Sequence, residues 1–302
     1  MKLKSFHLSI LFTLLLFFTS CQNQAPLGSK RNPIKMYFVP SVEAGKILSD
    51  GEKITEMLQQ ETGYYFHVAV PISYAAVIEA LGTNEADIVW LPPFAYILAN
   101  KLYDAQVGLT TIRNGLEKYR GQFLARADSG IDSLKDVEGK TVAYTDAAST
   151  SGYIYPSAIL KEKGISPAKT FFAGGHPQAI ISVYQGTADV ACTFWSPKRG
   201  NEIHDARMHV LNTYPDVTEK IKIFAFSDWI PNDTVTFSKN LAPEIKQNII
   251  SALIKIVRTE KGKKIFKDTY DIDGFVTSED SDYDIVRNAL ESLNLNAKKF
   301  IK

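Results

Sequence analysis

The sequence predicts an α/β protein of two lobes, each a mixed, mostly parallel sheet flanked by helices, with a ligand in the cleft between them. Strand-like apolar runs alternate with helical runs, which favours parallel β-α-β units. The 302 residues, 45% of them hydrophobic, suffice for two cores. A pattern of helix, Gly turn, Ala-Asp and apolar strand over residues 76–89 recurs over residues 179–191, as if both lobes share one αβ unit. Ligands of such sheets bind beyond the carboxyl ends of the strands, which here means between the lobes.

The first residues predict an export signal. Two lysines precede the apolar run Leu8–Phe18, and small residues follow it up to Cys21, as in a signal peptide with its cleavage site. Residues 1–20 are therefore interpreted as a signal peptide. Residues 21–33 are interpreted as a tether, since they are polar and contain Pro, Gly and Ser. The tether would be lipid-anchored, because a Cys directly after the small residues resembles a lipoprotein cleavage site. An unlipidated secreted protein, with an incidental Cys21, is the alternative.

Charge and cysteine content exclude some classes of function. Without the two lysines of the leader, 32 basic residues stand against 33 acidic ones, which gives no support to nucleic-acid binding. If Cys21 carries a lipid, only Cys192 remains, so the sequence contains no disulfide framework and no Cys/His metal spacing. We expect no cofactor and no metal, and Cys192 in its apolar run is predicted to be a buried thiol.

In the first third of the folded chain, strands and helices are predicted to alternate strictly. In order, the elements are a strand over 34–40, a helix that ends near Gly63, a strand over 64–70, a helix capped by Ser73, a strand over 87–91 and a helix opened by Pro92 and Pro93. Apolar residues at helical spacing define the helices, and Gly, Ser and Pro mark their ends.

The second run has the same character. Strands are predicted over 122–127, 141–144, 171–172, 188–194 and 221–226, and helices over 153–163, from His176 to Gly186, and over 241–258. Residues 227–234 have turn chemistry where the chain would return between lobes. Lobe 1 is therefore predicted to comprise residues 34–118 plus 228–302, and lobe 2 residues 119–227.

The segment Asp146–Gly152 joins the predicted strand 141–144 to the following helix. Such a turn presents free N–H groups and the positive end of the helix dipole. Three consecutive hydroxyls add donors, and Gly152 would let a ligand approach the backbone. The segment predicts a neutral cradle for a small oxyanion such as phosphate or phosphonate. A helix cap is the alternative, because one Ser or Thr at such a place often does no more.

Four stretches resemble one known family: residues 73–81, 87–96, 119–152 and 230–233. They are similar to the substrate-binding lipoproteins of phosphate, phosphite and phosphonate ABC importers. The resemblance implies a two-lobed, type II-like periplasmic-binding-protein fold that closes on its ligand and delivers a phosphorus oxyanion to ABC permease subunits. It further implies a monomer in the periplasm or at the cell surface, held at the membrane by a lipid on Cys21.

The resemblance also implies a set of ligand-binding residues. They are Ser149, Thr150, Ser151, Tyr74, Tyr119, His176 and Asp233. Tyr74 could instead pack in the core, His176 could be a surface cap, and Asp233 could cap a turn. The run Thr193–Ser196 is more apolar than expected where binders of amino-phosphonates carry an acidic residue, which argues against an amino-group ligand. Trp90 and Trp195 are expected in the core.

Two other classes of function remain open. A sensor subunit that presents its ligand to a membrane kinase would have the same lobes. An enzyme acting on phosphoryl groups is disfavoured because the sequence lacks a Gly-x-Ser-x-Gly turn, a phosphate loop with Lys and a metal cluster. Ser151 could be its nucleophile only with His176 as the base. We therefore predict that the protein is not an enzyme.

Overall fold

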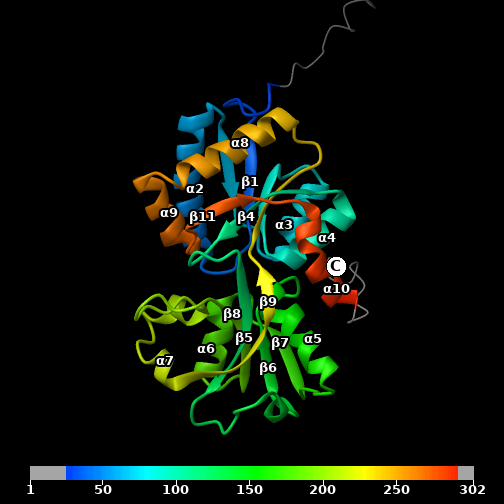
Figure 1. Cartoon of the computed structure of the whole chain (residues 1–302), viewed down its shortest axis with the longest axis vertical. Helices are drawn as coiled ribbons and strands as arrows, with labels where there is room; N and C mark the ends of the chain where they lie inside the picture. The colour runs from blue at the N-terminus through cyan, green and yellow to red at the C-terminus, as the bar shows by residue number, and fades with distance from the viewer. Residues whose placement is uncertain (1–24, 292–302) are drawn as a thin grey trace, which may run out of the picture.

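The computed structural model describes residues 25–291, so the predicted signal peptide and Cys21 lie outside the described residues. The chain forms two lobes, each a β-sheet flanked by helices, one above the other in Figure 1. The predicted two-lobed α/β architecture is confirmed. In residues 25–291, no helix has both the length and the apolar character needed to cross a membrane.

The first lobe contains a six-stranded sheet in the order β11-β4-β10-β3-β1-β2. Its strands are β1 (Ile34–Phe38), β2 (Phe66–Ala69), β3 (Ile88–Leu91), β4 (Gln106–Ile112), β10 (Thr234–Phe237) and β11 (Gly274–Thr277). Its helices are α2 (Ala44–Thr62), α3 (Tyr74–Gly82), α4 (Pro93–Tyr103), α8 (Pro243–Ile256), α9 (Glu260–Tyr270) and α10 (Asp284–Glu291), with a short 3-10 turn η5 (Asp280–Tyr283). The helix ends follow the sequence signals: Gly63 closes α2 at φ 77°, and the Ser73 hydroxyl accepts from Ala76 N at the start of α3.

The second lobe contains a five-stranded sheet in the order β7-β6-β8-β5-β9. Its strands are β5 (Lys118–Arg126), β6 (Thr141–Tyr144), β7 (Lys169–Phe172), β8 (Val190–Trp195) and β9 (Ile221–Pro231). Its helices are α5 (Tyr155–Glu162), α6 (His176–Tyr184) and α7 (Val217–Lys220), with the short turns η2 (Leu134–Val137), η3 (Thr150–Ile154) and η4 (Ala206–Val210). Cys192 on β8 is a buried free thiol, as predicted.

Both sheets are mixed, with a smaller parallel share than the alternation of elements suggests. The strand β1 runs parallel to β2 and β3, and β6 runs parallel to β7 and β8. The strands β4, β5, β9, β10 and β11 form only antiparallel pairs. Four of these, β4, β5, β9 and β10, adjoin the lobe crossings, where short links replace crossover helices.

The chain crosses between the lobes twice, over residues 113–117 and 232–233. Residues 227–231 are strand rather than the predicted turn, because β9 continues to pair with β5, past a shift of register, up to the pair Lys118↔Pro231. The two crossings are joined by Asn232, whose side-chain amide donates to the carbonyls of Thr111 at 3.0 Å and Leu116 at 2.8 Å. The lobe boundaries 34–118, 119–227 and 228–302 stay a prediction.

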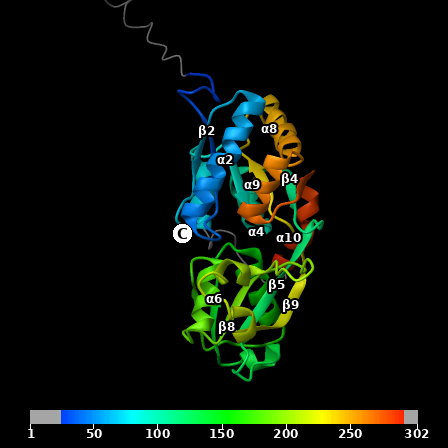
Figure 2. The same ribbon diagram turned by 90° about the vertical axis from the view of Figure 1, so that its left-hand side faces the viewer.

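Apolar packing continues from one lobe into the other. The core cluster around α3 and α4 also includes Tyr119, Ala148 and Ile154 of the second lobe. At the edge, α10 touches both α4 and α5, and Figure 2 shows it beside the junction of the lobes. These contacts describe lobes closed upon each other.

Candidate ligand-binding site

The turn after β6 builds the first wall of the site. Ser149 has extended backbone geometry, and its hydroxyl accepts a hydrogen bond from Gly152 N at 3.1 Å. The chain then makes one π-helical turn, Thr150–Ile154, before α5 begins. Because Thr150 and Ser151 start this turn, their N–H groups have no acceptor within it. Ser149 is therefore a helix cap, and the turn that it caps presents free N–H groups of the kind that can hold an anion.

Gly152 has a packing role that the sequence did not indicate. A Cβ added there would lie 2.2 Å from Thr145 Oγ1 and 2.8 Å from Ser149 Oγ. The glycine is needed because the turn packs tightly on the end of β6, and the approach of a ligand to its backbone stays a prediction.

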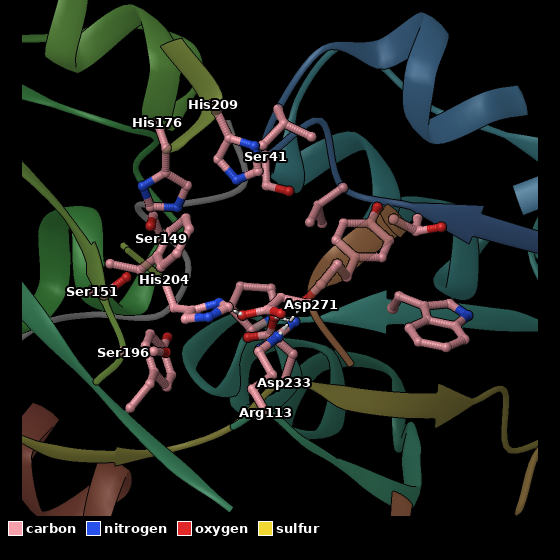
Figure 3. Close-up of a pocket in the computed structure, with 18 of the residues that line it drawn as sticks. Ser41, Arg113, Ser149, Ser151, His176, Ser196, His204, His209, Asp233 and Asp271 are labelled. Atoms are coloured by element: carbon pink, nitrogen blue, oxygen red, sulfur yellow. Dashed lines mark hydrogen bonds and ion pairs between the residues drawn. The ribbon is translucent and has the colours of Figure 1, made fainter. Parts of the chain in front are cut away.

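A cavity of about 100 Å³ lies between the lobes. Its volume is smaller than the roughly 300–1,000 Å³ of pockets for drug-sized ligands. Six of the seven predicted ligand-binding residues line it: Tyr74, Tyr119, Ser149, Ser151, His176 and Asp233. Figure 3 shows Ser149, Ser151 and His176 on one side of the cavity. It shows Arg113, Asp233 and Asp271 on the other. The structure thus brings these side chains together, while their role in binding stays a prediction.

Thr150 is the predicted residue that does not line the cavity. It is fully buried, and its hydroxyl accepts a hydrogen bond of 2.9 Å from Phe94 N, at the start of α4 in the other lobe. Thr150 therefore supports the contact between the lobes.

The two predicted tyrosines are neutral hydrogen-bonding groups. Tyr119 is the second residue of β5, and the hydroxyls of Ser151 and Thr150 hydrogen-bond to its phenol oxygen. Tyr74 is the first residue of α3 and is 2% exposed. Burial is the main cause that raises the pKa of both phenols far above the usual value, so both stay protonated. Tyr74 packs in the core and lines the cavity at once.

His176 is a buried, neutral imidazole at the start of α6. It is 6% exposed, which contradicts a surface cap. Burial, followed by the charges of His209 and Arg113, lowers its pKa to about 3. Its Nδ1 lies 3.3 Å from Thr145 Oγ1. Between residues 25 and 291 no hydrogen bond joins His176 to Ser151, and so low a pKa makes a poor general base at neutral pH.

Asp233 lines the cavity together with a paired cation, Arg113, which the sequence did not indicate. Arg113 Nη2 lies 2.8 Å from Asp233 Oδ2, so a salt bridge joins the two lobe crossings. Arg113 also donates through Nε to the carbonyl of Tyr270 at 2.8 Å. An arginine next to a lobe crossing could have indicated this salt bridge. The sequence does not show where the second crossing meets the first, however, so the partner of Arg113 could not be predicted.

Further cavity residues come from the strands β3 and β8, from η4 and α9, and from the segments between elements. They are Val39, Ser41, Val42, Trp90, Leu91, Pro92, Phe194, Ser196, His204, Met208, His209, Lys267, Asp268, Thr269, Tyr270 and Asp271. Trp90, expected in the core, stacks on Phe38 at 5.3 Å and also lines the cavity. Burial lowers the pKa of His209 to about 4, so this imidazole is neutral as well.

Helix N-termini from both lobes meet at the cavity. Besides the turn at Thr150, α6 begins at His176, whose N–H donates to the carbonyl of Ser41 in the first lobe at 3.1 Å. The first residue of α3, Tyr74, donates its N–H to the Asp146 carboxylate, and α4 begins beside Thr150. Parallel β-α units place helix starts at the carboxyl edge of each sheet, and their positive ends favour an anion without a free cation.

Comparison with known proteins gives one consistent result. A family model described as "ABC transporter, phosphonate, periplasmic substrate-binding protein" matches residues 36–283. The phosphate-import protein PhnD of Mycolicibacterium smegmatis is 29% identical over 175 residues, which are 53% of this chain and 54% of that protein. The chain therefore spans about half the length of this curated relative.

Two solved structures share the fold. A binding-protein component of a phosphonate ABC transporter from Pseudomonas aeruginosa superposes with a TM-score of 0.77 at 22% identity, covering 90% of this chain and 91% of that one. PhnD1 of Prochlorococcus marinus, solved in complex with methylphosphonate, has a TM-score of 0.74 at 16% identity, covering 86% of this chain and 98% of that one. At these identities, the likeness concerns the fold alone.

Proposed function

Since the chain belongs to the family of periplasmic substrate-binding proteins of phosphonate ABC transporters, we propose that it binds a small phosphorus oxyanion between its lobes and delivers it to the permease of an ABC importer. One observation carries this proposal. Ser149 and Ser151 lie at a helix start that faces a cavity of about 100 Å³ between the lobes. Neutral donors around such a cavity can hold an oxyanion by charge-assisted hydrogen bonds.

We further propose that the ligand is phosphate, phosphite or a phosphonate that carries no amino group. An ammonium group would need an unpaired carboxylate. The three carboxylates that line the cavity already have cations: Asp233 pairs with Arg113, Asp271 with Lys267, and Asp268 with Lys264. The apolar wall at Phe194 supplies no acidic group either.

The place of action that we propose is the periplasm or the cell surface, with a lipid on Cys21 as the anchor and a monomer as the working form. The signal-like start of the sequence supports export. Mass spectrometry of the membrane fraction would test the anchor: a diacylglycerol mass on Cys21 is expected, and an unmodified thiol would contradict it.

Isothermal titration of the purified mature protein would test the function. Phosphate, phosphite, methylphosphonate, aminoethylphosphonate and sulfate are titrated in turn. At least one of the first three should bind with micromolar or tighter affinity, and aminoethylphosphonate should bind more weakly. Binding of none of the phosphorus oxyanions would overturn the proposal.

A further inference from the structure

A pair formed by His204 and Asp271 bridges the lobes at the cavity. His204 follows β8 in the second lobe, and Asp271 ends α9 in the first. The distance between His204 Nδ1 and Asp271 Oδ2 is 2.6 Å. The imidazole is 4% exposed and the carboxylate 13%. Asp271 holds a left-handed conformation with φ 56°, as the residue that closes α9.

The second ring nitrogen of His204 has no partner. Its Nε2 is buried and makes no hydrogen bond to any residue within 25–291. The nearest charged group, Glu202 Oε2, is 4.0 Å away on a side chain that is 82% exposed. His204 lines the same cavity as Ser149 and Ser151, and in Figure 3 it lies between the serine side and the Asp271 side. A buried ring nitrogen without a partner costs free energy unless something binds it.

The hydrogen bond to Asp271 decides what Nε2 can offer. With the Nδ1 proton donated to the carboxylate, Nε2 is an acceptor in the neutral imidazole and a donor in the charged one. A protonated oxygen of the ligand can donate to the neutral ring, and an ionised oxygen can accept from the charged ring. Either way, one proton lies between Nε2 and the ligand oxygen. The pair then resembles the arrangement in which a carboxylate orients a histidine toward its ligand.

Among the described residues, the fixed cations that line the cavity are already paired and offer an entering anion no free positive charge. The lining contains two fixed cations, Arg113 and Lys267, against three carboxylates, Asp233, Asp268 and Asp271. Low pKa values keep the other two cavity-lining histidines of the neighbouring elements, His176 and His209, neutral. His204 is the third histidine of the lining, and its unpartnered Nε2 is the ring nitrogen that can share a proton with an anion.

We propose that His204 is a ligand-binding residue, oriented by Asp271, and that one proton is bound between its Nε2 and an oxygen of the ligand. The inference rests on the proposed function, because it concerns the same cavity. It adds a selection rule: the site takes an oxyanion together with a proton. Since Asp271 belongs to the opposite lobe, the oriented imidazole exists only when the lobes are closed.

The test is titration calorimetry of the mature protein in buffers of different ionisation enthalpy, with the tightest binder among phosphate, phosphite and methylphosphonate. At pH values where neither free partner carries the proton, binding should take up about one proton. Affinity should then fall about tenfold per pH unit, because the complex keeps a proton that both free partners have lost.

His204→Gln retains an uncharged amide donor near the position of Nε2. It should weaken binding roughly ten- to hundredfold and lower the uptake of protons toward zero. Asp271→Asn should reduce the uptake in part, because the amide orients the ring less strictly. His67→Gln, at an exposed position of β2, is the matched control and should behave as wild type.

Three outcomes would overturn the inference. Wild-type binding without proton uptake would do so, and so would uptake that persists in His204→Gln. Uptake that vanishes only in Asp233→Asn would place the proton on another group. If no phosphorus oxyanion binds at all, the proposed function falls and takes this inference with it, so the two failures are distinguishable.

Discussion

Ser149, Thr150 and Ser151 are neighbours in sequence, yet their hydroxyls make different contacts. Ser149 accepts from Gly152 N, Thr150 accepts from Phe94 N in the other lobe, and Ser151 bonds to Tyr119. Only Ser149 and Ser151 line the cavity. A substitution at each position therefore tests a different part of the mechanism.

Loss of a cavity hydroxyl should weaken binding. Ser151→Ala should cost about 1.5–3 kcal/mol, or roughly ten- to hundredfold in affinity, because a charge-assisted bond is removed. Calorimetry with the tightest anion measures it, and the melting temperature of the ligand-free protein should change little. Ser149→Ala should also lower stability by about 0.5–2 kcal/mol, since the helix cap is lost. Wild-type affinity in both variants would mean that the anion binds elsewhere.

Asp233 is predicted to control which anion is accepted. Asp233→Asn should improve binding of sulfate relative to phosphonate, because Arg113 then keeps its charge without a carboxylate partner. Competition titrations measure the ratio of the two affinities. If Asp233 only caps a turn, stability falls while that ratio stays constant.

His176 should make stability depend on pH. Its pKa is lowered from 6.5 to about 3 by burial, so below pH 6.5 the unfolded chain gains a proton that the native protein refuses. Its contribution to stability is therefore full above pH 6.5 and is lost as the pH falls toward 3. Urea unfolding of the ligand-free protein at several pH values measures it. His176→Asn should have the flatter profile, and a parallel profile for the two proteins would contradict the assignment.

At the scale of elements, the site depends on how tightly the turn Thr150–Ile154 packs on β6. Gly152→Ala should destabilise the protein by about 1–3 kcal/mol, because the new methyl would overlap Thr145 Oγ1. Gly45→Ala on α2 is the matched control, since its Cβ would meet nothing closer than 3.8 Å. Chemical denaturation measures both. Equal stability of the two variants would show that the turn can relax.

At the scale of the whole molecule, the described state is closed. Contacts between the lobes include Phe94 N to Thr150 Oγ1, His176 N to Ser41 O, and the His204–Asp271 pair. All lie at the cleft, whereas the crossings at residues 113–117 and 232–233 lie at its base. Such an arrangement permits hinge motion about the crossings.

Ligand should therefore shift the protein from an open to a closed form. Small-angle scattering should show a smaller radius of gyration with the bound anion than without it. Thr150→Val removes a lobe contact that is not part of the cavity, so it should weaken binding and leave the ligand-free protein with the wild-type radius. A radius that does not respond to saturating ligand would count against a site between moving lobes.

The sequence by itself determined the alternation of strands and helices, the turn at Ser149–Ser151 and the two-lobed fold class. These features are local: apolar periodicity sets each element, and Ser, Gly and Pro set its ends. It also indicated six residues that the structure places around one cavity.

Only the tertiary structure decided the rest. The antiparallel strands at the crossings, the pairing of Arg113 with Asp233 and the contact of His204 with Asp271 join residues more than sixty positions apart. Such contacts depend on where the chain crosses between lobes and on how far the lobes close. No local pattern encodes a distance between two segments that meet only after folding, so the sequence could not show which charges surround the cavity.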